Sequence, residues 1–109
     1  MNLLEIENQF STLCDIDKIK DDLTQSFFRL IHNAENIEIK DEIDKHAKGE
    51  DFVLTFSSIS LHILNHNKRA PYLFARLDIS TNTLNKPFAW YDIEYGVQGE
   101  FLDDYLDFY

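Results

Sequence analysis

The first half of the chain carries apolar residues at helical spacing. Between Asp15 and Asn36 they recur every three or four positions, at Ile16, Ile19, Leu23, Phe27, Leu30, Ile31 and Ala34. This spacing places them on one face of a helix of about five turns. Asp15 is its expected N-cap, because a side-chain oxygen there accepts hydrogen bonds from the free N–H groups of the first turn. The segment from Asn33 to Asn36 is expected to end the helix.

Two shorter helices are expected on either side of this one. A leading helix within residues 2–13 is predicted from Leu3, Leu4, Ile6, Phe10 and Leu13. A following helix is predicted from Ile39, Ile43 and Ala47, and Gly49 is its stop. The rest of the surface of this third helix is acidic and carries Glu38, Asp41, Glu42 and Asp44.

After Gly49 the period of the apolar residues changes to two, which is the spacing of strands. The expected strands are Phe52–Phe56, Ile59–Leu64, Tyr72–Ile79, Phe88–Tyr95 and Glu100–Phe108. A polar turn at 65–69, a polar connection at 80–87 and a hairpin at 96–99 separate them. The pattern predicts an α+β fold, with N-terminal helices packed on one face of an antiparallel sheet of about four to five strands. We expect one domain over 1–109, helical over about 2–48 and a sheet over about 52–108.

The composition is that of a folded, water-soluble chain. Hydrophobic residues make up 44% of the 109 positions, and only three are glycine and two proline. No apolar run has the length that a membrane helix needs, and the first residues lack the features of a signal peptide. Cys14 is the only cysteine, so no disulfide framework is possible. We therefore expect a cytoplasmic protein without a membrane partner.

The chain is strongly acidic. Twenty Asp and Glu against ten Lys and Arg give a formal net charge of −10. Such a charge repels nucleic acid and accelerates encounters with basic proteins. Solubility alone is the alternative explanation. The oligomeric state stays open at this point.

No motif for catalysis or cofactor binding is present, so we expect a protein that is not an enzyme and needs no cofactor. His62 and His66 have a spacing that suits zinc on a helix, but their segment is predicted to be a strand running into a turn. We therefore expect no metal site. Tyr72, Phe74 and Arg76 form an aromatic and basic strand face that could stack single-stranded nucleic acid. The net charge opposes that role, and a second layer of packing is the favoured interpretation.

The most informative feature is the acidity of the last two strands. Residues 88–109 contain six carboxylates and no Lys or Arg. A two-residue turn at Val97 and Gln98 would place Asp92 opposite Asp103, Glu94 opposite Phe101, and Ile93 opposite Leu102. Like charges on neighbouring strands reduce stability, so their presence indicates a binding function. The predicted partner-binding residues are the carboxylates and the aromatic residues beside them: Trp90, Asp92, Glu94, Glu100, Asp103, Asp104, Tyr105 and Asp107.

The aromatic and acidic segments 89–95 (AWYDIEY) and 99–106 (GEFLDDYL) give the chain a profile that resembles the immunity proteins of bacterial polymorphic-toxin and contact-dependent inhibition systems. The resemblance implies an inhibitor that binds and neutralises a cognate basic toxin domain, often a nuclease. Two alternatives remain, an antagonist that mimics nucleic acid and a small ligand-binding domain. A further open choice is whether the last hairpin or the acidic helix around Glu38 to Asp44 meets the partner.

Overall fold

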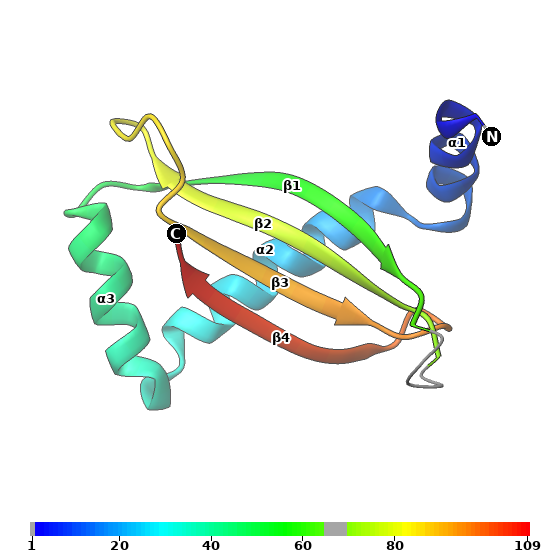
Figure 1. The fold of residues 1–109 in the computed structure, drawn as a ribbon. Helices are drawn as coiled ribbons and strands as arrows, with labels where there is room; N and C mark the ends of the chain where they lie inside the picture. Colours follow the sequence, from blue (N-terminus) through cyan, green and yellow to red (C-terminus); the bar gives the residue numbers. More distant parts are fainter. Residues whose placement is uncertain (1, 65–69) are drawn as a thin grey trace.

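The computed structural model describes residues 2–64 and 70–109, apart from the side chain of Leu13. The element order is α1 (Leu3–Leu13), α2 (Ile16–His32), the short 3-10 helix η1 (Ala34–Asn36), α3 (Ile37–Ala47), β1 (Phe52–His62), β2 (Tyr72–Thr81), β3 (Ala89–Tyr95) and β4 (Phe101–Phe108). The helices precede a four-stranded antiparallel sheet, so the predicted α+β class is confirmed (Figure 1). The predicted turn at 65–69 lies outside the described residues.

The four strands form a simple meander in the order β1-β2-β3-β4. β1 and β4 are therefore the two edges. The prediction of separate strands at Phe52–Phe56 and Ile59–Leu64 was wrong, because β1 is continuous and the pairing with β2 only shifts between Phe56 and Ser58. The extra residue of this bulge, Ser57, interrupts the alternation of side chains, and the sequence pattern registers it as a break.

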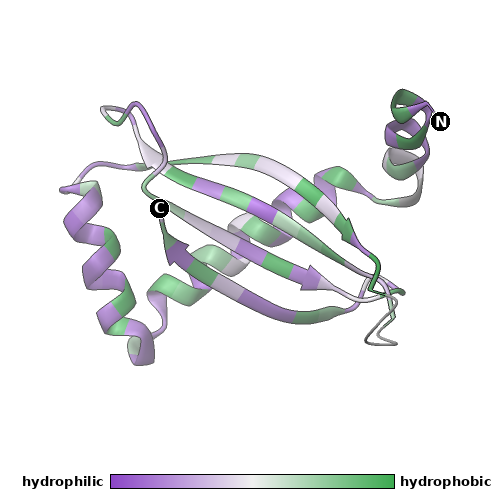
Figure 2. Cartoon of the chain, in the orientation of Figure 1, coloured by the Kyte–Doolittle hydropathy of each residue, from purple (hydrophilic) through white to green (hydrophobic). Residues whose placement is uncertain are grey.

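The core lies between α2 and the central strands. Leu23 and Phe27 of α2 are fully buried, and they share one cluster with Leu77, Ile79 and Tyr91 of the sheet. Figure 1 shows α2 crossing behind the strands, and Figure 2 shows that apolar and polar positions alternate along β2 and β3. The alternation sends the apolar side chains of these strands toward α2, while every second side chain points to the other face.

The caps of α2 and α3 follow from single residues. Asp15 caps α2, because its Oδ1 accepts a hydrogen bond from the backbone N–H of Lys18 at 3.1 Å. The Asn36 side chain donates to the carbonyl of Leu30 at 2.9 Å and satisfies an acceptor at the other end. α3 ends at Ala47, and the residues that follow it, Lys48 and Gly49, have φ angles of 53° and 80° in the left-handed region.

The pairing predicted for the last hairpin was wrong. Asp92 lies opposite Tyr105, and Glu94 lies opposite Asp103. Ile93 lies opposite Asp104. The turn is longer than two residues, since the N–H of Gly96 donates to the carbonyl of Glu100 at 2.8 Å and Gly99 has φ 80°. A register shift next to Tyr95 adds one more residue to β4.

The buried position of Phe27 generates a stability prediction. Its ring lies 5.8 Å from that of Phe52 and 6.1 Å from that of Tyr91, centroid to centroid, so it joins α2 to the sheet. Phe27→Ala is expected to lower the free energy of unfolding by about 3 to 5 kcal/mol, because it leaves a cavity between the layers. The matched control is Phe101→Ala, whose side chain is 57% exposed. Urea denaturation that shows equal losses for the two variants would contradict this packing.

Candidate functional site: the open face of the sheet

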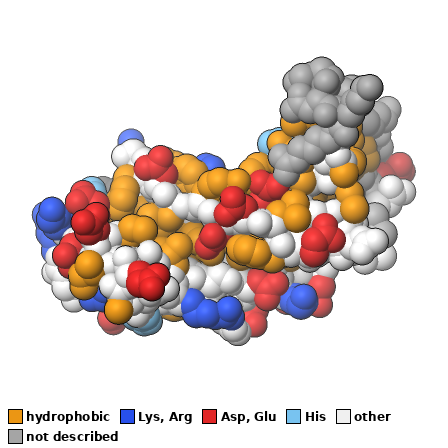
Figure 3. Space-filling view, turned by 90° about the horizontal axis from the view of Figure 1, so that it is seen from below, with side chains coloured by type: hydrophobic (Ala, Val, Ile, Leu, Met, Phe, Trp, Pro, Cys, Tyr) orange, Lys and Arg blue, Asp and Glu red, His pale blue; other side chains and the backbone are white. Residues whose placement is uncertain are grey.

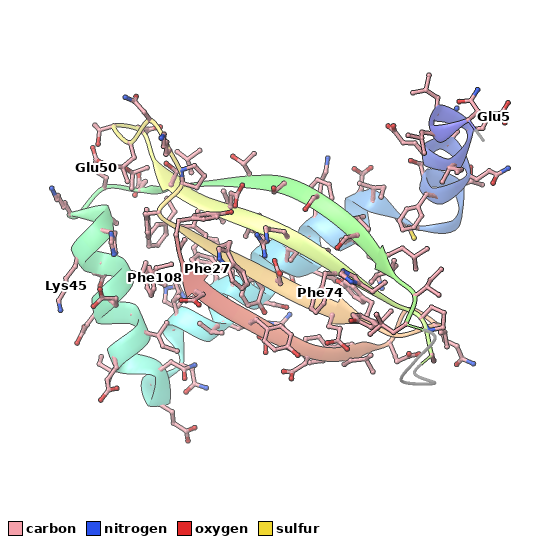
Figure 4. All side chains as sticks on the ribbon, viewed as in Figure 1. Glu5, Phe27, Lys45, Glu50, Phe74 and Phe108 are labelled. Atoms are coloured by element: carbon pink, nitrogen blue, oxygen red, sulfur yellow. The ribbon has the colours of Figure 1, made fainter. Side chains whose placement is uncertain are left out.

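One face of the sheet is not covered by any helix of the described chain. α2 passes behind the strands, and Figure 4 shows Phe74 on the side turned toward the viewer. We call this side the open face. It is defined by side chains that occupy matching register positions on β2, β3 and β4: Tyr72, Phe74, Arg76, Asp78, Trp90, Asp92, Glu94, Asp103, Tyr105 and Asp107. A second packing layer, which the sequence favoured for Tyr72, Phe74 and Arg76, is not found among the described residues.

An ion pair lies at the centre of the open face. Arg76 on β2 donates from Nε to Asp92 Oδ1 at 2.8 Å and from Nη2 to Asp92 Oδ2 at 3.0 Å. The carbon between these nitrogens lies 4.2 Å from the centroid of the Trp90 ring, so the guanidinium also stacks on the indole. Asp92 is only 6% exposed. Hydrogen bonding to Asp92 raises the pKa of Arg76. The charge of this carboxylate is therefore compensated by a residue of β2, outside the acidic segment 88–109.

A row of aromatic rings lies beside the ion pair. The Phe74 ring contacts that of Tyr105 at a centroid distance of 5.8 Å and that of His62 at 5.2 Å. The Tyr105 hydroxyl donates to Glu94 Oε1 at 3.2 Å, and Glu94 is only 5% exposed. Burial, followed by the charges of the nearby Asp103 and Glu94, raises the pKa of Tyr105. Glu94 is thus held in place by the aromatic row.

The remaining acids of the open face are accessible. Asp103 and Asp107 are exposed and accept hydrogen bonds from the backbone N–H of the residue that follows each of them, both at 2.8 Å. Asp78 is half-buried and accepts a hydrogen bond from the Tyr109 hydroxyl. Figure 3 looks onto the molecule from the β4 side and shows acidic side chains interspersed with apolar ones. Arg76 is the only cation among the open-face residues defined above.

Six of the eight predicted partner-binding residues lie together on this face, and two do not. Trp90, Asp92, Glu94, Asp103, Tyr105 and Asp107 share the open face. Asp104 lies opposite Ile93 and points to the helix side of the sheet. Glu100 is in the turn, where its Oε2 accepts a hydrogen bond from the N–H of Gln98 at 3.2 Å. Alternation along β4 places Asp104 on the opposite face from its neighbours Asp103 and Tyr105, and Glu100 precedes the strand.

Asp104 borders a groove on the helix side, between α2 and the last two strands. The groove has a volume of about 690 Å³. The Tyr91 hydroxyl donates to Asp104 Oδ2 at 2.7 Å, and the Tyr95 hydroxyl donates to Asp22 Oδ2 at 3.3 Å. Burial, reinforced by these carboxylates, raises the pKa of both tyrosines well above the usual value. Both hydroxyls therefore stay protonated at neutral pH and hold the two carboxylates in place by hydrogen bonds.

Four contributors to the open face were missed in the sequence. Tyr72, Phe74 and Arg76 were assigned to a separate strand face, and Asp78 was not among the predicted partner-binding residues. The signal was present in the alternation of β2, which places Phe74, Arg76 and Asp78 on one side. The alternation does not tell which strands lie next to each other in the sheet. Arg76 comes to lie beside Asp92 because β2 pairs with β3.

Within residues 2–64 and 70–109, no three His, Cys, Asp or Glu side chains come together so that they could hold a metal ion. His62 stacks on Tyr72 at 4.9 Å between ring centroids, and His66 lies outside the described residues. None of the helices in the same part of the chain has the length and apolar content needed to cross a membrane.

No protein-family model, no curated protein and no solved structure matches this chain. The function is therefore inferred from the chemistry of the open face.

The central ion pair generates a stability prediction. Arg76→Ala leaves the nearly buried Asp92 carboxylate without its charged partner and exposes Trp90, so unfolding should become easier by about 1 to 3 kcal/mol. The lower part of this range allows for the side chain of Arg76, which is 33% exposed. Lys40→Ala is the control, because Lys40 pairs with Asp44 on the exposed surface of α3 and should contribute less than about 0.5 kcal/mol. Equal losses of unfolding free energy for Arg76→Ala and Lys40→Ala, measured by thermal unfolding, would contradict a stabilising role of the Arg76–Asp92 pair.

Proposed function

We propose that this protein is an inhibitor of the immunity-protein type, and that it binds a basic toxin domain through the open face. The observation that carries the proposal is the concentration of carboxylates and aromatic side chains on the sheet face that no helix of the described chain covers. Among the residues that the structure describes, five acids face this side, Asp78, Asp92, Glu94, Asp103 and Asp107, and Arg76 supplies one guanidinium.

The arrangement of charge favours a basic protein as the partner. Arg76 is already engaged by Asp92 through two hydrogen bonds, so its charge is taken up by that carboxylate, and the exposed Asp103 and Asp107 keep the face acidic. Asp103 and Asp107 are exposed and placed at the β4 side, where lysine or arginine side chains of a partner can reach them. A negative field of this kind also steers a basic protein toward the face and raises the association rate.

The aromatic residues favour a protein partner over a simple cation. Trp90, Phe74 and Tyr105 lie between the acids and present flat rings that are partly accessible. Trp, Tyr and Arg are the residue types that contribute most of the energy in protein interfaces. The Arg76–Asp92 pair and the Tyr105–Glu94 hydrogen bond hold the rings and acids in fixed positions, so little side-chain freedom is lost on binding.

The test is a calorimetric titration against the basic domain encoded in the neighbouring reading frame of the source genome. Asp103→Lys combined with Asp107→Lys should weaken binding by several kcal/mol, because both reversed charges face the partner. Both positions are exposed, so the fold should be retained, and circular dichroism checks this. Asp92 is unsuitable for charge reversal, since a lysine there would lie against Arg76.

The control is Glu38→Lys combined with Asp41→Lys, which reverses two exposed charges on α3. It makes the same change in net charge on the other acidic surface. The proposal requires the open-face variant to lose far more affinity than the α3 variant. The opposite order would move the interface to α3, and the absence of any binding to a basic domain would overturn the proposed function.

A further inference from the structure

One edge of the sheet is uncharged. β1, Phe52–His62, has 11 residues and contains no Asp, Glu, Lys, Arg or Pro, although 28% of the chain is charged. In Figure 2, β1 alternates between green and near-white over most of its length, while the other strands carry purple positions. β4, the opposite edge, carries Asp103, Asp104 and Asp107. Charged side chains and proline are the usual means of preventing an edge from pairing with another strand.

Apolar side chains are exposed along the same edge. Leu61, near the end of β1, is 53% exposed, and Ile63, directly after the strand, is 63% exposed. Among the described residues, β1 pairs only with β2, so its outer backbone groups have no strand partner. Free backbone groups next to exposed apolar side chains form a template for one more strand.

We propose that β1 pairs antiparallel with β1 of a second copy, so that two sheets join into one around a twofold axis. A register centred on Leu61 places Leu61 opposite its own copy and Ile63 opposite Ile59, and these three side chains lie on the same side of the strand. When a strand pairs antiparallel with the same strand of a second copy, the two copies are related by a twofold axis. The bulge at Ser57 confines the new ladder to the half of β1 that follows it.

The distribution of charge favours a second copy over a basic partner at this edge. β1 offers no carboxylate to a basic chain. Two copies that join through β1 keep their acidic β4 strands at the outer ends of the joined sheet, seven strand spacings apart. That separation is about 34 Å, several times the screening length at physiological salt. Pairing through β1 therefore keeps the β4 acids of the two chains, each of net charge −10, well apart.

The inference is independent of the proposed function, because the paired edges leave the open face of each copy accessible. The two ideas fail separately: a monomer can still bind a basic domain, and a dimer can exist without binding one.

Sedimentation equilibrium of the purified full chain tests the proposal. The expected mass is twice the 12.9 kDa of one chain. Leu61→Glu should raise the dimer dissociation constant by about 100-fold or more, because it sets two carboxylates against each other across the axis. Leu102→Glu is the matched control and should leave the dimer intact, since Leu102 is a similarly exposed leucine on the opposite edge, at 46%. Circular dichroism verifies that both variants fold.

Amide hydrogen exchange shows which strand forms the contact between the two copies. The amides of 58–63 should exchange faster in Leu61→Glu than in the wild type, while those of β4 stay unchanged. A wild-type chain that sediments as a monomer up to ~1 mM would overturn the proposal. Equal weakening by the two substitutions, or protection of β1 that appears only when a basic domain is added, would also overturn it.

Discussion

A sheet covered by helices on one side only must present its second face to water, and the rest of this structure depends on how that face is stabilised. In β2 and β3 the alternation of side chains gives α2 the apolar residues and leaves the open face with acids and aromatic rings. Acids so close together would repel one another. Arg76 reduces this repulsion by binding Asp92 with two hydrogen bonds and stacking on Trp90, and Tyr105 donates a hydrogen bond to Glu94. The central acids are thus tied to neighbours, and the exposed acids at β4 remain accessible.

The two edges of the sheet differ in their charge. Three aspartates on β4 discourage strand addition there, and β1 has no charged residue at all. A field that is strong at one side of the sheet and weak at the other suits a protein with two different contacts, one with a basic domain and one with its own copy. α1 lies apart from the sheet in Figure 1, and its Leu3 and Leu4 are each 70% exposed.

Local patterns were sufficient to predict the three α-helices and the last three strands. The apolar stripe and the Asp15 cap predicted α2, and the period of two predicted β2, β3 and β4 to within a few residues. Two features depend on backbone geometry that the patterns do not encode. The bulge at Ser57 made one strand look like two, and the longer turn after Gly96 moved Asp92 from Asp103 to Tyr105. The pairing of Arg76 with Asp92 was missed for a third reason, since it joins residues on different strands whose neighbour relation no local pattern specifies.

The central claim is that the open face is the surface that a basic partner covers, and Trp90 allows a direct measurement because it is the only tryptophan in the chain. The measurement is acrylamide quenching of Trp90 fluorescence, in the free protein and in a complex with the basic domain encoded in the neighbouring reading frame. Any tryptophan of that basic domain is replaced beforehand, so that the signal comes from Trp90. Acrylamide is neutral, so the charge of the face does not bias the result. The account predicts that Trp90 becomes shielded on saturation, to the same extent in the α3 charge-reversal variant. A saturated complex in which quenching of Trp90 is unchanged would contradict the account.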